Sequence, residues 1–581
     1  MDLGRCLAEK AKRSVRKIIA APTIIRISAT MPTSTLAWPG PGEAELLVGG
    51  PARTPFRKSS GFDAIRRSGV RIDSARRRLR SALSSPLASS HDGRRARNLS
   101  VDQQRFRHAT DVVRKVVERL SDEVWQLAEV SFHEQESSRA HLRELEAADF
   151  TITSRGTAGI PTAFVAEWTQ GEDVPAIGFL PEYDALPGLG NAAVPRAEPR
   201  EDGVTSGHGC GHNLLGAALT GAAIAAKGAA ETRGLAARLR VYGCAAEETE
   251  GAKIYMAREG SFDDLDACLH WHPASVAAVA NVRLASVNML KIDFHGQTAH
   301  AGLEPWKGRS ALHAMELAAH GLNVMREHLE PTARVQYIVE AGGEAPNVVP
   351  DYTRMFLTLR DVDRARVTAT TEWVHEIAKG AAQATQTTAN VLVYAGMHDL
   401  LPNTPLAERM QTHLEQVGAP AWDDGDQEFA RACQRELGMP EAGLAGDVQP
   451  LLDEPSLGGA TDVAEASWIT PTMGIAMPTM PLGVPLHTWP VTACGGMSIG
   501  GKGALAATEV LTRMALELLT DAELRAAARA DLDRRRGDYA YVSPLPPDQR
   551  HPIDLPDWLI TDGSAEAMGA LERNSLRTAL A

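Results

Sequence analysis

The stretch Gly207 to Asn213 reads GHGCGHN and places a thiol and two imidazoles within seven residues. Thiolate and imidazole groups are the ligands that zinc and related transition metals prefer. Cys210 and His212 are separated by one residue, so in an extended loop both side chains can converge on one ion. Short His/Cys clusters also arise by chance, and the stretch therefore predicts a metal site only if further ligands follow.

A pair of carboxylates is the next candidate. Glu247 and Glu248 lie in CAAEET, at the end of the apolar stretch ARLRVYG. Adjacent side chains in a strand point to opposite sides, so one carboxylate could bind metal while its neighbour faces the substrate as a general base. The alternative interpretation is a solvated acidic turn.

Two histidines complete the set of possible ligands. His272 in CLHWHP follows an apolar strand, and His487 in GVPLHTWP lies in a loop bounded by prolines, while His270 can be a packed residue of the same strand. The ligand-competent side chains are Cys210, His212, Glu248, His272 and His487. With Glu247 beside them, they suffice for two adjacent divalent ions that share a water.

Alternating elements are predicted to position these residues. Residues 105–150 have apolar side chains at helical spacing, which predicts two helices. The apolar stretch LLGAALTGAAIAA begins at Leu214 and stops at Lys227, which predicts a buried helix. TAFVAEW, AIGFLPEYDALPG and ARLRVYGCAAEE predict strands, the last of them running into the acidic pair. This alternation favours an α/β sheet, in which catalytic groups gather at the carboxyl ends of the strands.

Composition and charge limit the function classes. A chain of 581 residues with 44% hydrophobic and 23% charged residues is typical of a globular protein with two or three domains. Six scattered cysteines do not resemble a secreted disulfide framework, which favours a reducing, cytoplasmic location, and no apolar run reaches membrane-spanning length. Residues 101–581 carry a net charge of −26, which disfavours nucleic-acid binding by this part of the chain.

The first hundred residues differ from the rest. They hold 20 Lys and Arg against 7 Asp and Glu, with little hydrophobic periodicity. Three interpretations remain open for residues 1–100: a disordered nucleic-acid-binding arm, an organelle transit segment, or upstream sequence translated from a wrongly chosen start.

Several motifs, in their order, resemble the M20 metallopeptidase/amidohydrolase family. They are EYDALPGLG, GHGCGHNLLGAA, YGCAAEETEGAKIYMAREGSFDDLDACLHWHP, FHGQTAHAGLEPWKGRSAL, APNVVP, GATDVAEASW and GVPLHTWP. The similarity covers residues 104 to 545 and is greatest to subfamily D, within it to hydrolases of p-aminobenzoyl-glutamate. It implies an α/β catalytic domain with a central sheet flanked by helices, interrupted by a smaller α+β lid and dimerisation domain. The implied boundaries are 101–285 and 398–545 for the catalytic domain, 286–397 for the lid and 546–581 for a C-terminal tail.

The resemblance also implies roles for residues. Cys210, His212, Glu248, His272 and His487 match the metal ligands, Cys210 being a thiolate shared by two divalent ions. Glu247 matches the general base, and His208 is expected in a supporting role or none. His300 resembles a histidine that reaches the neighbouring subunit's active site. Asn347 and Arg360 resemble groups that bind the substrate carboxylate and carbonyl; their alternatives are a helix cap and a surface cation.

The implied activity is hydrolysis of the amide bond of an N-acyl or N-aroyl amino acid, with a p-aminobenzoyl-glutamate-like small molecule favoured. The donor set favours zinc and the resemblance favours manganese, which we rank first. We expect a homodimer, with a homologous partner chain as the alternative. Other classes remain open: an aminoacylase or dipeptidase of the same family, and a non-catalytic metal-binding protein, which the presence of Glu247 disfavours.

Overall fold

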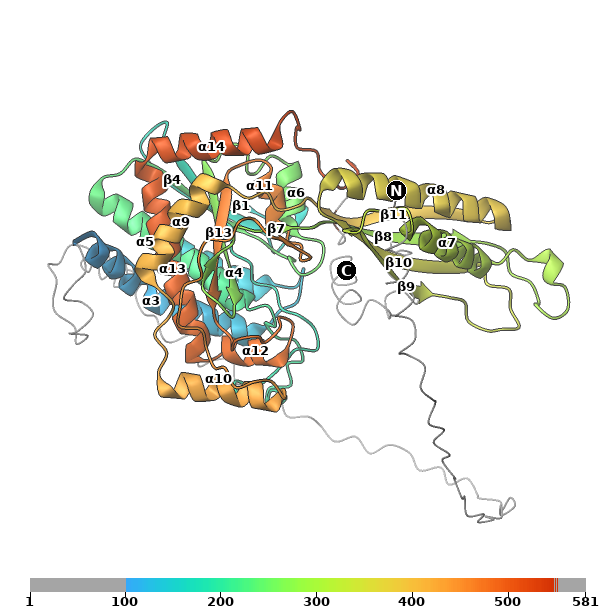
Figure 1. Cartoon of the computed structure of the whole chain (residues 1–581), viewed down its shortest axis with the longest axis horizontal. Coiled ribbons are helices and arrows are strands. Elements are labelled where there is room, and N and C mark those ends of the chain that lie inside the picture. Colours follow the sequence, from blue (N-terminus) through green and yellow to red (C-terminus); the bar gives the residue numbers. More distant parts are fainter. Residues whose placement is uncertain (1–100, 548, 550, 552–581) are drawn as a thin grey trace, which may run out of the picture. The chain divides into compact units, whose positions relative to one another are not determined.

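The computed structural model describes residues 101–547, 549 and 551 (Figure 1). The predicted basic segment 1–100 and most of the predicted tail 546–581 lie outside these residues. The strands are β1 Thr151–Arg155, β2 Phe164–Gln170, β3 Ala176–Phe179, β4 Ala237–Gly243, β5 Ala267–Ala274, β6 Ala278–Val279, β7 Arg283–Leu284, β8 Ser286–His295, β9 Arg334–Ala341, β10 Tyr352–Asp361, β11 Thr388–Met397, β12 Ser456–Leu457 and β13 Thr472–Pro478. The α-helices are α3 Val101–Leu127, α4 Gln135–Ala147, α5 His212–Arg233, α6 Ala252–Arg258, α7 Ala311–Arg326, α8 Arg364–Thr385, α9 Thr404–Val417, α10 Asp424–Glu436, α11 Val463–Ser467, α12 Trp489–Gly495, α13 Ser498–Thr520 and α14 Ala522–Arg536.

The larger sheet has seven strands in the order β1-β2-β4-β3-β5-β13-β6. Its four central strands, β4, β3, β5 and β13, run parallel, and the outer strands extend the sheet through antiparallel pairings. All four residues of β3 are buried, as expected for a strand covered on both faces. Because the carboxyl ends of parallel strands meet at one edge of a sheet, the loops after these four strands lie together. The predicted mixed α/β fold is confirmed.

Helix α5 lies at the centre of the main core. Its sequence of alanines, glycines and leucines is buried on almost every side, which confirms the predicted buried helix. Helices α3 and α13 pack against it, and a Cβ at Gly221 of α5 would lie 2.3 Å from Val117 of α3. Small residues therefore let the helices approach closely. The two helices predicted over residues 105–150 are α3 and α4.

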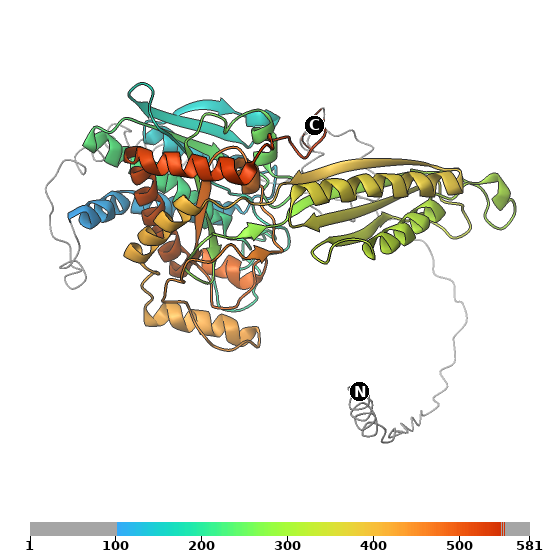
Figure 2. The same cartoon turned by 45° about the horizontal axis from the view of Figure 1, so that its top comes forward.

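Residues 286–397, which we call the insert, form a second sheet with the order β11-β8-β10-β9 (Figure 2). All three strand pairings are antiparallel. Helices α7 and α8 cover one face and share a separate apolar core with the strands, which includes Leu290, Met315 and Val374. The insert thus contains its own hydrophobic core, and β9 forms one edge of its sheet.

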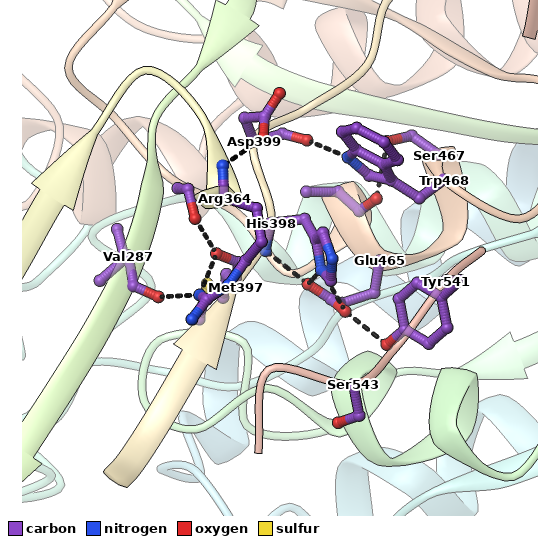
Figure 3. A network of polar contacts seen from close by, with 12 residues as sticks. Val287, Arg364, Met397, His398, Asp399, Glu465, Ser467, Trp468, Tyr541 and Ser543 are labelled. Atoms are coloured by element: carbon purple, nitrogen blue, oxygen red, sulfur yellow. Dashed lines mark hydrogen bonds and ion pairs between the residues drawn. The ribbon is translucent and has the colours of Figure 1, made fainter. Parts of the chain in front are cut away.

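A buried polar network lies where the insert returns to the larger sheet (Figure 3). His398, the residue after β11, has Nδ1 at 3.0 Å from Glu465 Oε1 and Nε2 at 2.9 Å from the Tyr539 hydroxyl. Glu465 also accepts hydrogen bonds from the His398 N–H at 2.6 Å and from the Tyr541 hydroxyl at 2.5 Å. The rings of Trp468, Tyr539 and Tyr541 surround the imidazole, with centroids 5.1–5.9 Å away. We call these five residues the junction network.

The first and last strands of the insert are fastened together beside this network (Figure 3). The Ser286 hydroxyl, at the start of β8, donates to the Met397 carbonyl at 2.7 Å. Arg364, at the start of α8, donates to Asn288 Oδ1 at 2.8 Å. The two crossings between the insert and the rest of the chain are therefore adjacent. In the part of the chain that the structure describes, no helix is long and apolar enough to cross a membrane.

Candidate metal centre and active site

The GHGCGHN stretch forms the loop that leads into α5, and its glycines are there because side chains would not fit. Gly211 has a φ of +78°, and a Cβ at this position would lie 2.9 Å from Pro273. A Cβ at Gly209 would lie 2.4 Å from a neighbouring leucine side chain. The turn at Gly211 presents Cys210 and His212, both buried, on either side of it. The small residues therefore let two potential ligands approach the same point.

Two imidazoles each have Nδ1 fixed by an acceptor and Nε2 turned toward the other candidate ligands. His272 Nδ1 lies 2.7 Å from the Pro273 carbonyl, which can only accept, so Nδ1 carries the proton and Nε2 faces Cys210 Sγ at 3.3 Å. His212 Nδ1 lies 2.8 Å from Asp184 Oδ1, and its Nε2 is buried without a hydrogen-bond partner. A ring whose far nitrogen is fixed by an acceptor is the usual arrangement of a metal-binding histidine.

Glu248 links these imidazoles to His487. Its Oε2 lies 3.3 Å from His487 Nε2, and its Oε1 lies 3.9 Å from His212 Nε2 and is buried without a hydrogen-bond partner. The loop after β13 carries His487 and is held against the Cys210 loop by a 2.8 Å hydrogen bond from the His487 N–H to the Gly209 carbonyl. Segments almost 280 residues apart therefore meet at one point.

The ligand atoms form three overlapping groups, each with all its atoms within 4.8 Å of one another. The groups are Cys210, His212 and His272; Cys210, Glu248 and His487; and Glu182, His212 and Glu247. All five predicted ligands belong to the first two groups, which share Cys210. A thiol that belongs to both groups is suited to bridge two ions.

Buried negative charge surrounds the third group. Glu247 Oε2 lies 3.9 Å from His212 Nε2. Lys253 Nζ lies 2.8 Å from Glu182 Oε1 and also contacts Asp462. Burial and the charges of Glu182 and Asp462 raise the pKa of Glu247 well above its usual value. One lysine does not balance these carboxylates, so the donor set and the excess of negative charge both fit divalent cations.

The acidic pair follows the end of a strand, as predicted, but the expected alternation of strand side chains does not apply to it. Strand β4 ends at Gly243, and Glu247 and Glu248 follow in a tight turn. Ala246 has a φ of +56°, and its carbonyl accepts a hydrogen bond from the Gly251 N–H at 2.8 Å. The two carboxylates therefore owe their directions to a turn and not to the alternation of a strand.

His300 and Asn347 lie side by side at one end of the insert. The Ala301 N–H donates to the Asn347 carbonyl at 3.0 Å. The exposed His300 ring accepts hydrogen bonds at Nδ1 from the N–H groups of Gly302 at 3.2 Å and Leu303 at 3.1 Å. A neutral His300 therefore carries its proton on Nε2, which can donate to a ligand. The next element after Asn347 is strand β10 and not a helix, which removes the capping interpretation of this side chain.

Arg360 lies near the opposite end of β10 from Asn347. It pairs with Val287 at the start of β8, and its Nη1 donates to the Gly458 carbonyl at 3.2 Å. Strands rise about 3.3 Å per residue, so β10 covers roughly 26 Å between Tyr352 and Arg360, and Asn347 comes before Tyr352 in the chain. One small substrate cannot contact both side chains of the same chain.

Sequence reasoning missed Asp184, which holds residues of the candidate metal centre in place. Its carboxylate accepts from His212 Nδ1, from the Glu248 N–H at 2.9 Å and from the Ser131 hydroxyl at 2.9 Å. The signal was present in EYDALPG, whose acidic residues follow a buried strand at its carboxyl end. His208 lies outside the metal-ligand groups: it is buried, with Nε2 at 3.0 Å from the Val124 carbonyl.

Comparison with known proteins agrees with this site. Residues 284–386 match the model of the peptidase dimerisation domain of M20 proteins. The chain belongs to the M20 peptidase and amidohydrolase family and is a hydrolase that acts on amide bonds.

The relatives are similar over most of their length. The chain is 34% identical over 475 residues to one of the two named subunits of the p-aminobenzoyl-glutamate hydrolase of Escherichia coli (strain K12), covering 77% of this chain and 96% of that protein. It is 28% identical over 444 residues to human Xaa-Arg dipeptidase, covering 73% and 90%. A putative aminohydrolase from methicillin-resistant Staphylococcus aureus has the same fold, with a TM-score of 0.53 at 18% identity, covering 72% of this chain and all of that one. The predicted family membership is confirmed.

Proposed function

We propose that this protein is a metal-dependent amidohydrolase that cleaves the amide bond of an N-acyl or N-aroyl amino acid. The observation that carries the proposal is the cluster in which His212 Nε2 and Glu248 Oε1 are buried without hydrogen-bond partners. Such atoms are costly to bury unless a ligand satisfies them. The similarity to a p-aminobenzoyl-glutamate hydrolase favours a substrate of that kind.

The proposed metal site holds two divalent ions through five ligands. These are Cys210, His212, Glu248, His272 and His487. Manganese is ranked first on family resemblance, while the thiolate and imidazole donors favour zinc. Ions bound there would polarise the scissile carbonyl and lower the pKa of the attacking water.

The chain's own groups handle protons and the developing charge. Glu247 is proposed to take the proton from the attacking water and to return it to the leaving amine. His300 Nε2–H is proposed to donate to the tetrahedral oxyanion. Asn347 and Arg360 are proposed to bind the substrate carboxylate and carbonyl. Because they lie at opposite ends of β10, we assign them to different subunits at each site.

A homodimer formed through the inserts would bring the Asn347 end of one insert close to the Arg360 end of the other. Exposed apolar side chains follow the edge strand β9 and helix α7: Ile338, Val339, Leu317 and Val324. A sheet edge and a helix with exposed apolar residues favour pairing with another copy, and residues 284–386 match a dimerisation domain. The alternative is a homologous partner chain, since two relatives are named as different subunits of one hydrolase. The five cysteines among the described residues are free and buried, which supports the proposed cytoplasmic location.

The substrate class is tested with the manganese-loaded and zinc-loaded proteins. The panel contains p-aminobenzoyl-glutamate, N-acetyl and N-benzoyl amino acids, and dipeptides that end in arginine. We expect the highest kcat/KM for p-aminobenzoyl-glutamate. A preference for arginine dipeptides would move the assignment to the dipeptidase alternative, and the absence of hydrolysis across the panel would contradict the proposed function.

The intersubunit role of His300 is tested by mixing inactive variants. His300→Ala should keep its metal and its dimeric state while turnover falls by about 10²–10³, as for a lost oxyanion donor. Subunit exchange with Glu247→Gln should then restore activity, because heterodimers contain one site with both groups intact. A mixture that exchanges subunits and stays inactive would show that His300 acts within its own chain or not at all.

A further inference from the structure

The turn that carries Glu247 and Glu248 begins with a residue in an unfavourable backbone conformation. Ala246 has a φ of +56°, in the left-handed region. For a residue with a side chain, this conformation is less favourable than the right-handed region. Such strain persists only where neighbouring groups hold the residue in place.

Glu134 supplies a contact that holds it. The Ala246 N–H donates to Glu134 Oε1 at 2.8 Å. Glu134 is fully buried and lies just before α4, more than a hundred residues earlier in the chain. A carboxyl group buried at 0% exposure beside the catalytic turn has no role in the metal-ligand groups, so its contact with Ala246 needs its own explanation.

The turn is fixed on both sides of Glu247. On the carboxyl side, the Glu248 N–H donates to Asp184 Oδ2 at 2.9 Å. On the amino side, the turn is held by the hydrogen bond from the Ala246 N–H to Glu134. Rotation of Ala246 out of the left-handed region would move Glu247 while Glu248 kept its anchor.

We propose that Glu134 is a positioning residue for Glu247: its carboxyl group keeps Ala246 in the left-handed conformation that directs Glu247 toward the metal ligands. The inference rests on the proposed role of Glu247 as general base. The alternative is that Glu134 contributes only to the stability of the fold. A glycine at position 246 distinguishes the positioning role from the purely structural role. Glycine adopts a positive φ without strain, so the turn should then depend less on Glu134.

The protonation state of Glu134 identifies the matched control. Burial and the nearby charge of Asp184 raise the pKa of Glu134 to about 8. At pH 7 the carboxyl group is therefore mostly neutral, and glutamine has the same shape and can accept from the Ala246 N–H. Methionine has a similar length and lacks the acceptor.

The experiment compares four variants for kcat, KM, metal content and melting temperature. Glu134→Met should lower kcat by about 10- to 100-fold, the range expected for a displacement of about 1 Å, while KM and metal content change little. Glu134→Gln should stay near wild type. Ala246→Gly alone should be nearly neutral, and Glu134→Met combined with Ala246→Gly should recover most of the lost kcat without recovering the melting temperature.

Two outcomes would overturn the proposal: a Glu134→Met protein with wild-type kcat, and a double variant as slow as Glu134→Met. If Glu134→Met does not fold, Glu134→Asp replaces it, because the shorter side chain withdraws the acceptor by one methylene.

Crystal structures of the same variants give a readout that needs no substrate. In Glu134→Met, residue 246 should leave the left-handed region and the Glu247 carboxylate should shift, whereas Glu134→Gln should superpose on wild type. An unchanged turn in Glu134→Met would overturn the positioning role even if no substrate is found. If the wild type hydrolyses none of the amides in the panel but the turn shifts as expected in Glu134→Met, the proposed function is overturned and the positioning role of Glu134 is not.

Discussion

The metal-ligand cluster and the junction network use the same kinds of side chain in opposite ways. Each has a fully buried histidine beside a glutamate: His212 lies beside Glu248, whose Oε1 is buried, and His398 lies beside the fully buried Glu465. At the junction, His398 Nδ1 has Glu465 as its partner (Figure 3), and His398 Nε2 has the Tyr539 hydroxyl. In the cluster, His212 Nε2 and Glu248 Oε1 have none.

This difference is the reason for proposing a ligand at the cluster and none at the junction network. A buried polar atom without a partner costs about 1–3 kcal/mol, and a chain that retains several of them together gains when an ion satisfies them. A fully satisfied network has no capacity left for a ligand and acts on rigidity and stability. Burial and residue type alone would not have distinguished the two.

The largest expected effect tests the assignment of roles inside the metal-ligand cluster. Glu247→Gln should keep its metal and lower turnover by about 10²–10⁴, as for the loss of a general base. Glu248→Gln should lose metal, because Glu248 is a proposed ligand whose carboxylate lies between the proposed ligands His212 and His487. Metal analysis beside steady-state kinetics checks both. Equal metal loss in the two variants would show that the roles are misassigned.

Removal of the ions should destabilise the protein through the cluster alone. Ligands that bind the folded state stabilise it by about 4 kcal/mol at a free concentration a thousand times Kd. Chelation should therefore lower the melting temperature of the wild type, and Glu465→Gln should show the same decrease because its change lies in the junction network. A chelator that leaves the melting temperature unchanged would contradict the metal site.

Glu465→Gln should act on stability and leave metal content unchanged. The substitution weakens the buried hydrogen bonds that Glu465 accepts from His398 and Tyr541, at about 1.5–3 kcal/mol for a charged acceptor. Urea unfolding of the metal-free protein measures it. The control is Glu376→Gln on the exposed side of α8, which should change the free energy of unfolding by less than about 0.5 kcal/mol. Metal loss in Glu465→Gln would break the distinction between the two regions.

The smallest expected effect is a pH dependence of the difference in unfolding free energy between wild type and Glu465→Gln. Burial opposes ionisation of Glu465, but the charge and hydrogen bonds of His398 outweigh it and lower the pKa. A lowered folded-state pKa contributes stability that is present above about pH 4.5 and is lost as the pH falls through the folded value. The gap in unfolding free energy between wild type and Glu465→Gln should therefore shrink below pH 4.5. A gap that widens on acidification would show that the sign is wrong.

A residue of the candidate site could be predicted from the sequence when its signal lies in a short motif, and not when it depends on contacts between distant segments. The five proposed ligands could be named from the sequence because each lies in a short motif and the motifs occur in a recognisable order. The direction of Glu247 could not, because it depends on Ala246 and on Glu134, whose contact joins distant segments. The junction network escaped prediction for the same reason: Tyr539 and Tyr541 meet His398 across some 140 residues, and nothing near them in sequence marks the meeting.

The position of the insert within the chain has a consequence for synthesis. Strands β5 and β13 pair directly, yet β13 is made about two hundred residues after β5. The antiparallel strands of the insert are closer in sequence, which favours faster folding. We therefore expect the insert to fold on the ribosome while the larger sheet is still incomplete. Chains stalled in α10 should yield a protease-resistant fragment covering residues 286–397, and its absence would contradict this order. Because the proposed ligand His487 follows β13, we expect full metal uptake only after the last quarter of the described chain has been made.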